Sequence, residues 1–143
     1  GGEIELPVRL KVHYSIFVPM AKWCMLVAGN YRCIQQEEMR SIKDAVHSDI
    51  ELSRSVYAWV AELCRDLGAD AADQVPFEKY ANAANSLVNP SSAARALAAG
   101  VPNIERVDCL VKTIAAQRGK QFDVVDETVD LVDMWLEKNR AAQ

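Results

Sequence analysis

The sequence lacks several features that would assign it to a well-marked class. No apolar run approaches the ~20 residues that a bilayer span needs, and no G-x-G-x-x-G or G-K-[ST] phosphate loop is present. Basic residues do not dominate, because 16 lysines and arginines stand against 20 aspartates and glutamates. Nucleic-acid binders usually carry a basic face. We therefore expect no membrane partner, no nucleic-acid partner, and no nucleotide held by a glycine-rich loop.

Cysteine is scarce, and its spacing does not define a zinc site. Structural zinc usually uses closely spaced cysteine pairs, but the sequence contains no C-x-x-C motif. Free cysteine among apolar neighbours behaves as a small buried hydrophobe. We therefore expect core thiols in a reducing, cytoplasmic protein. The four cysteines are Cys24, Cys33, Cys64 and Cys109.

Histidine is scarcer still, with two residues in the chain. His47 has Asp44 and Glu51 at helical spacings of three and four residues. One interpretation is a carboxylate–histidine metal cluster, and the alternative is a solvated helix face with one weak ion pair. The second interpretation predicts no metal ligand in this chain.

The first 19 residues show a different pattern from the rest. Apolar and polar side chains partly alternate between residues 4 and 14, which predicts a strand, and Pro7 restricts that strand to an edge. A lone strand has no partner elsewhere in the sequence. We interpret residues 1–19 as an extended lead-in from a missing or removed N-terminal half, with pairing to a second copy as the alternative.

Helical periodicity takes over from residue 20, and we predict one compact all-α domain of six or seven helices over residues 20–143. The clearest helix covers residues 48–67, with Ser48 as N-cap, Glu51 completing a capping box and Gly68 as the C′ residue. The other predicted helices lie near residues 20–31, 39–46, 76–87, 92–99, 104–118 and 125–136.

Polar side chains recur near the middle of the chain at a helical spacing. Asn82, Asn85, Asn89 and Ser92 follow one another every three or four residues around a predicted helix end. On a helix they would place amides and a hydroxyl along one side, toward a helix N-terminus that can hold an anion. This arrangement suits a small polar carboxylate, and the alternative is two helix caps with solvated amides.

The second half of the chain resembles a known family. Residues 89–111 read N-P-S-S-A-A-R-A-L-A-A-G-V-P-N-I-E-R-V-D-C-L-V, and Gly119 and V-V-D-E-T-V-D-L-V follow. The paired serines, the later glycines and their spacing are similar to the C-terminal domain of ketopantoate reductases, which is 6-phosphogluconate-dehydrogenase C-terminal-like. Trp23 and Leu26 resemble the family's W-x-K-L-x-x-N helix. The resemblance covers most of the chain from residue 20 onward.

The resemblance implies a fold and a reaction. In this family an all-α domain packs beside an NADP-binding Rossmann domain, and the substrate lies between them. NADPH passes a hydride to the carbonyl of a 2-oxo acid, in pantothenate biosynthesis. The chain would then be the substrate-binding and oligomerisation domain of an NAD(P)-dependent oxidoreductase, forming a homo-oligomer such as a dimer. It would bind no cofactor and catalyse nothing without the Rossmann domain.

The sequence departs from the family where the catalytic groups should be. The family lysine falls on Met25, and a thioether can neither donate a proton nor stabilise an alkoxide. The family asparagine on the same helix falls on Gly29, with Asn30 one residue further. The substrate-side asparagine and serine are retained as Asn89 and Ser92.

The family glutamate falls on Asn103, and Glu105 then takes the aspartate position; a one-residue slip in the preceding turn would reassign both. We therefore name no catalytic residue. The predicted substrate-binding residues are Asn30, Asn89, Ser92, Asn103 and Glu105. A divergent reductase and a non-catalytic descendant both remain open. The alternative from another class is a helical protein-interaction module with no small-molecule site.

Overall fold

Helices account for the regular structure of residues 19–143, the part of the chain that the computed structural model describes, apart from one isolated bridge between Ile34 and Met39. This confirms the predicted all-α domain, whereas the predicted strand at residues 4–14 lies outside the described residues. The elements follow in the order η2 (Met20–Lys22), α2 (Trp23–Met25), η3 (Leu26–Asn30), η4 (Tyr31–Cys33), α3 (Ile42–His47), α4 (Ile50–Asp66), η5 (Ala71–Asp73), α5 (Phe77–Ala84), α6 (Ser92–Ala98), α7 (Val107–Gln117) and α8 (Asp123–Ala141).

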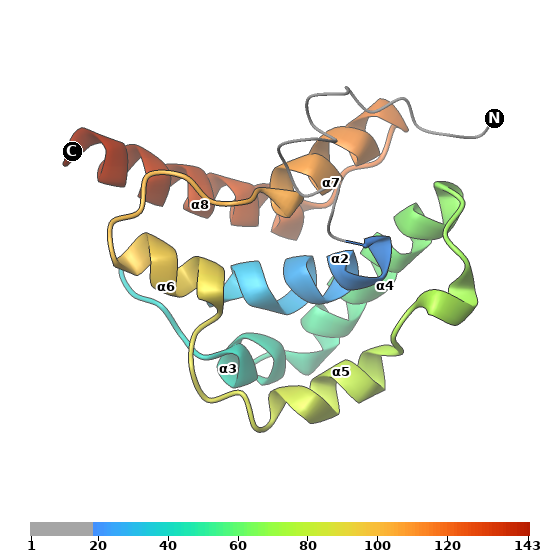
Figure 1. Ribbon diagram of the computed structural model, residues 1–143. Helices are drawn as coiled ribbons and strands as arrows, with labels where there is room; N and C mark the ends of the chain where they lie inside the picture. The colour runs from blue at the N-terminus through green and yellow to red at the C-terminus, as the bar shows by residue number, and fades with distance from the viewer. Residues whose placement is uncertain (1–18) are drawn as a thin grey trace.

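The elements from η2 to η4 run on from one another as one helical segment, residues 20–33, which we call the central helix. Figure 1 shows it in blue through the middle of the molecule, with α7 and α8 on one side and α3 and α5 on the other. The central helix contacts α3, α4, α6, α7 and α8. These five helices are therefore all positioned by packing against the central helix.

The core follows the apolar stripes expected from the sequence. On the central helix Trp23, Val27 and Tyr31 are buried, as the three- and four-residue spacing predicts. Full burial of an apolar side chain of the size of valine or larger contributes roughly 1.5–3 kcal/mol to the free energy of unfolding. The buried stripes of the longer helices include Val56, Val60 and Leu63 of α4, Val107, Val111 and Ile114 of α7, and Val125, Val132 and Leu136 of α8.

The ends of α4 confirm one expectation and correct another. Gly68 adopts a φ of 97° just past the helix, and the N–H of Ala69 donates to the carbonyl of Cys64 at 2.9 Å, which closes a Schellman motif. The predicted N-cap, Ser48, is wrong. Its backbone is helical because it ends α3, and Asp49 caps α4 by accepting from the N–H of Leu52 at 3.1 Å.

Tertiary contacts shorten two of the predicted helices. The bridge to Ile34 holds Met39 outside α3, so α3 begins only at Ile42. Helix α5 ends at Ala84 rather than near residue 87. The N–H groups of Ile42 and Lys43 at the start of α3 donate to the carbonyls of Asn89 and Leu87, at 3.1 and 3.0 Å. The loop after α5 is therefore fixed to α3 by backbone bonds.

Three of the four cysteines are buried thiols, as expected, and Cys109 is half-buried. Burial and the neighbouring charge of Asp108 raise the pKa of Cys109 to about 11, which keeps it protonated at neutral pH. No helix in residues 19–143 is long and apolar enough to cross a bilayer.

Candidate functional site

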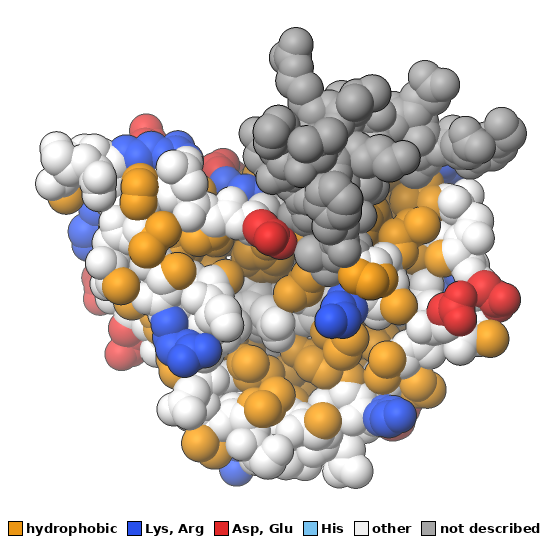
Figure 2. Space-filling view, in the orientation of Figure 1, with side chains coloured by type: hydrophobic (Ala, Val, Ile, Leu, Met, Phe, Trp, Pro, Cys, Tyr) orange, Lys and Arg blue, Asp and Glu red, His pale blue; other side chains and the backbone are white. Residues whose placement is uncertain are grey.

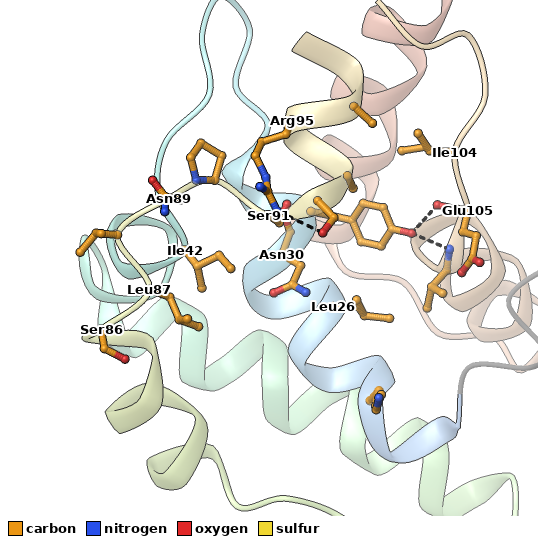
Figure 3. Close-up of a pocket in the computed structure, with 18 of the residues that line it drawn as sticks. Leu26, Asn30, Ile42, Ser86, Leu87, Asn89, Ser91, Arg95, Ile104 and Glu105 are labelled. Atoms are coloured by element: carbon orange, nitrogen blue, oxygen red, sulfur yellow. Dashed lines mark hydrogen bonds between the residues drawn. The ribbon is translucent and has the colours of Figure 1, made fainter. Parts of the chain in front are cut away.

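An open cavity of about 820 Å³ lies between the central helix, the start of α3, the loop of residues 86–91, α6 and the segment before α7. Figure 3 shows side chains from these elements turned toward the same space. Figure 2 shows hydrophobic side chains around the hollowed middle of this face, with separate Lys and Arg side chains at its edges. The cavity is mostly apolar, with a small number of polar groups, which is the usual composition of a small-molecule site.

Asn30 lines the cavity at the end of a π-helical stretch of the central helix, η3. A π turn holds one more residue than an α turn, and such turns are frequent at functional sites. Asn30 also follows Leu26 by four residues, so both side chains lie on one face of the central helix, and both line the cavity.

Tyr80 of α5 fixes how the Asn30 amide is turned. The Tyr80 hydroxyl lies 3.2 Å from Oδ1 of Asn30 and 3.2 Å from the carbonyl of Met25. The one hydroxyl proton is shared between these two acceptors; Oδ1 of Asn30 faces Tyr80, and no described residue accepts from Nδ2. Burial raises the pKa of Tyr80, so the hydroxyl stays protonated as a donor.

Two cations and one carboxylate line the cavity: Lys22 of the central helix, Arg95 of α6 and Glu105 before α7. None of the three forms an ion pair within 4.0 Å of another residue in the described range. The chain as a whole carries a net charge of −4, whereas the charged lining sums to +1. The described part of the lining is therefore a local site of net positive charge.

The two serines at the start of α6 have separate roles. Ser91 is buried; its hydroxyl donates to the carbonyl of Asn30 at 2.7 Å and accepts from the N–H of Ala94 at 3.3 Å. It thereby caps α6 and ties it to the central helix. Ser92 is exposed in the lining, with Oγ 3.4 Å from Nη2 of Arg95. Ser92 is therefore available to a ligand and Ser91 is not.

Replacing Ser91 with alanine is expected to lower the free energy of unfolding by about 1–2 kcal/mol, because the helix cap and a buried hydrogen bond are lost together. Urea denaturation followed by circular dichroism measures this. Ser92→Ala is the matched control and should stay within about 0.5 kcal/mol of the native protein. Equal losses for the two variants would contradict the division of roles.

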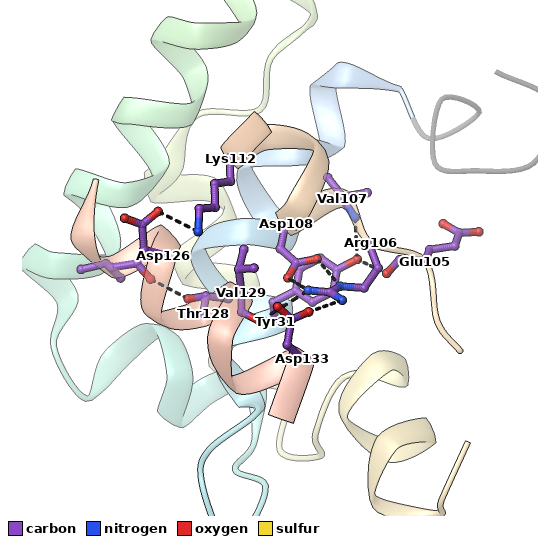
Figure 4. Close-up of polar contacts among 11 residues, drawn as sticks. Tyr31, Glu105, Arg106, Val107, Asp108, Lys112, Asp126, Thr128, Val129 and Asp133 are labelled. Carbon is purple, nitrogen blue, oxygen red and sulfur yellow. Dashed lines mark hydrogen bonds and ion pairs between the residues drawn. The ribbon is translucent and has the colours of Figure 1, made fainter. Parts of the chain in front are cut away.

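Tyr31, Glu105 and Val107 form another wall of the cavity. Buried polar contacts between the central helix and the start of α7, drawn in Figure 4, hold this wall in place. The hydroxyl of Tyr31 donates to the carbonyl of Glu105 at 2.5 Å and accepts from the N–H of Val107 at 3.0 Å. Next to it, Arg106 forms two 3.0 Å bonds to the carboxylate of Asp108, which is fully buried. These bonds fix the backbone from which the Glu105 side chain extends.

Burial opposes the charge of Arg106, but its hydrogen bonds to Asp108 and then to Asp133 outweigh that cost and hold its pKa above the usual value. The second partner, Asp133 of α8, lies 2.8 Å away and is more than half exposed. The pair with Asp108 is therefore the one shielded from water.

The structure brings together four of the five predicted substrate-binding residues. Asn30, Asn89, Ser92 and Glu105 line the cavity. Asn103 does not, and its Oδ1 accepts from Nη2 of Arg140 at 3.1 Å. Glu105 therefore lies at the cavity, and Asn103 lies outside it.

Several other candidates lie elsewhere. Met25 is half-buried and absent from the lining, and Asn82 and Asn85 are exposed away from it, because α5 ends before the repeat reaches the cavity. His47 places Nε2 2.8 Å from the carbonyl of Ala81. In residues 19–143 no three His, Cys, Asp or Glu side chains are grouped so as to hold a metal ion.

Sequence reasoning missed two of the cavity's charged residues, Lys22 and Arg95. For Lys22 a signal was present: residues 22, 26 and 30 follow at four-residue spacing, and all three line the cavity. Arg95 follows Ser92 by three residues on α6, the spacing at which helical side chains share a face.

Comparisons with family models, with curated proteins and with solved structures found no match to this chain.

Proposed function

We propose that this chain is the substrate-binding domain of an NAD(P)-dependent oxidoreductase that acts on a small 2-oxo acid. The observation that carries the proposal is the cavity lined by Lys22, Asn30, Ser92 and Arg95, which presents two cations that form no ion pair with residues 19–143, an amide donor and a hydroxyl within mostly apolar walls. A 2-oxo acid offers one carboxylate and one carbonyl, both of which accept hydrogen bonds. The number and type of donors match those acceptors.

Each polar residue has a distinct role in this proposal. Arg95 binds the carboxylate through its planar guanidinium, and the neighbouring Ser92 hydroxyl donates to the same group. The Asn30 amide, oriented by Tyr80, donates to the carbonyl oxygen. Lys22 adds a second positive charge to the lining, which the thioether of Met25 cannot supply.

The nicotinamide cofactor does not fit the residues of this chain. The sequence contains no glycine-rich loop for a pyrophosphate, and both cations of the cavity are assigned to the 2-oxo acid. The cofactor would have to be bound by a separate domain. The chain alone is expected to bind the acid and to catalyse no reduction when NADPH is added.

The test is a calorimetric titration of the chain with 4-methyl-2-oxopentanoate. Arg95→Gln is expected to raise Kd by about tenfold or more, because a hydrogen bond to a charged partner contributes about 1.5–3 kcal/mol. Arg118→Gln is the matched control, since Arg118 is an exposed arginine outside the cavity lining. The corresponding neutral amide of the acid should bind more weakly than the acid itself. An unchanged Kd in Arg95→Gln would count against the proposal.

A second candidate function is a helical interaction module or homo-oligomer. It is favoured by three exposed apolar side chains, Leu87 at 40 %, Val88 at 66 % and Val101 at 37 % exposure. Exposed apolar groups of this kind often mark partner surfaces. This candidate predicts that Asn82, Asn85, Asn89 and Ser92 line no concavity; Asn82 and Asn85 line none, whereas Asn89 and Ser92 line the cavity. Sedimentation that shows a concentration-independent monomer would count against it.

A further inference from the structure

We infer that the ligand carries an extended apolar group, which lies against Ile42 and Leu87 while its carboxylate is bound at Arg95. The inference rests on the proposed function and narrows its substrate class, from small 2-oxo acids in general to those with an unbranched or branched hydrocarbon chain. Short, polar 2-oxo acids such as pyruvate would then be poor ligands.

The side chains that support this inference lie on one side of the polar groups. Figure 3 shows Ile42 and Leu87 together on one side of Asn30, and Ile104 and Glu105 on the other. Leu26 lies next to Asn30 on the central helix and also lines the cavity. An apolar chain directed from Arg95 past Asn30 would reach the side on which Ile42 and Leu87 stand.

Apart from the side-chain amide of Asn89, which also lines the cavity there, the polar groups on that side are engaged elsewhere. The hydroxyl of Ser86 donates to the carbonyl of Ala83 at 3.0 Å. The backbone carbonyls of Leu87 and Asn89 accept from α3. The three charged residues of the lining are Lys22, Arg95 and Glu105, and none belongs to α3 or to the loop of residues 86–91. A hydrocarbon group of the ligand can lie against this wall without being buried as a charged group that has no partner.

The wall is formed before any ligand arrives. The two backbone hydrogen bonds from the start of α3, 3.1 and 3.0 Å long, hold the loop that carries Leu87. Binding therefore does not have to order this loop, a cost that would otherwise reduce affinity.

The size of the cavity also exceeds what a short acid requires. At about 820 Å³ it lies in the range that accommodates drug-sized ligands. Pyruvate would fill only a small part of this volume and would leave Ile42 and Leu87 in contact with water. Covering them with hydrocarbon is the favourable alternative, at about 25 cal/mol per Å² of apolar surface removed from water.

The experiment is a titration of the chain with the straight-chain series from pyruvate to 2-oxohexanoate. Each buried methylene is expected to lower Kd by about fourfold, or about sixtyfold over the series. Leu87→Asn should reduce this dependence to less than about twofold per methylene. Val101→Asn is the matched control, because Val101 is a comparably exposed apolar residue outside the cavity lining; it should leave the chain-length dependence unchanged.

The outcomes separate the two proposals. If all acids bind with equal Kd and Arg95→Gln weakens them equally, the apolar site is overturned and the proposed function stands. If the dependence on chain length survives Leu87→Asn, the inference that this wall holds the chain is overturned. If no 2-oxo acid binds at any length, both the proposed function and the inference fail.

Discussion

Replacing Arg106 with leucine is expected to lower the free energy of unfolding by about 3–5 kcal/mol, the largest stability effect we predict for a single substitution. The reason is the partner left behind, since breaking a buried ion pair leaves an uncompensated charge. Asp108 is fully buried, and both of its carboxylate oxygens accept from Arg106. Leucine fills much of the space but offers no donor.

Urea denaturation measures this loss, and Asp133→Asn provides its control. Asp133 is the exposed partner of the same arginine, and exposed ion pairs contribute about 1 kcal/mol or less. A loss below about 1 kcal/mol in Arg106→Leu would contradict the assignment of Asp108 as a buried carboxylate that depends on this arginine.

Replacing Gly29 with alanine is expected to cost about 3 kcal/mol, because a methyl group is forced into a packed interface. A Cβ at residue 29 would stand 1.9 Å from the Tyr80 hydroxyl oxygen and 2.9 Å from the adjoining ring carbon. Tyr80 would have to move, and with it the hydrogen bond that orients Asn30. Gly29→Ala should therefore weaken binding of a 2-oxo acid as well as stability.

A second substitution shows whether the clash is the cause. Tyr80→Phe removes the oxygen that lies closest to the added methyl group, so the double variant Gly29→Ala/Tyr80→Phe should be more stable than Gly29→Ala alone. The relief is partial, because the ring carbon at 2.9 Å remains. A double variant that unfolds more readily than Gly29→Ala would contradict this explanation. Tyr80→Phe alone measures the contribution of the hydroxyl.

Most of the fold could be predicted from the sequence, since it depends on local patterns. The stripe of Trp23, Val27 and Tyr31 and the Gly68 helix end follow from spacing and from one residue's backbone preference. The predicted cap at Ser48 was wrong because two helices meet there, and the serine serves the earlier one. A single sequence pattern does not show which of two adjoining helices a polar residue belongs to.

The candidate site was less predictable, since it depends on long-range placement. The four-residue spacing of Lys22, Leu26 and Asn30 indicates a shared helix face, but no residue pattern marks the π-helical stretch at whose end Asn30 lies or shows which elements face it. Glu105 and Asn103 are two residues apart, and the contact with Arg140 separates their positions in the fold. The wall at Leu87 depends on backbone bonds from α3, across more than forty residues of sequence.

The central claim is that the cavity binds a 2-oxo acid through Arg95, Ser92 and Asn30. The most direct test is a titration of ¹⁵N-labelled protein with 2-oxohexanoate, followed by ¹H–¹⁵N correlation spectra. The account predicts saturable shifts of the Asn30 side-chain amide and of the backbone amides of Ser92 and Arg95, with α8 unaffected. Spectra that do not change, or saturable shifts confined to residues outside the cavity, would contradict it.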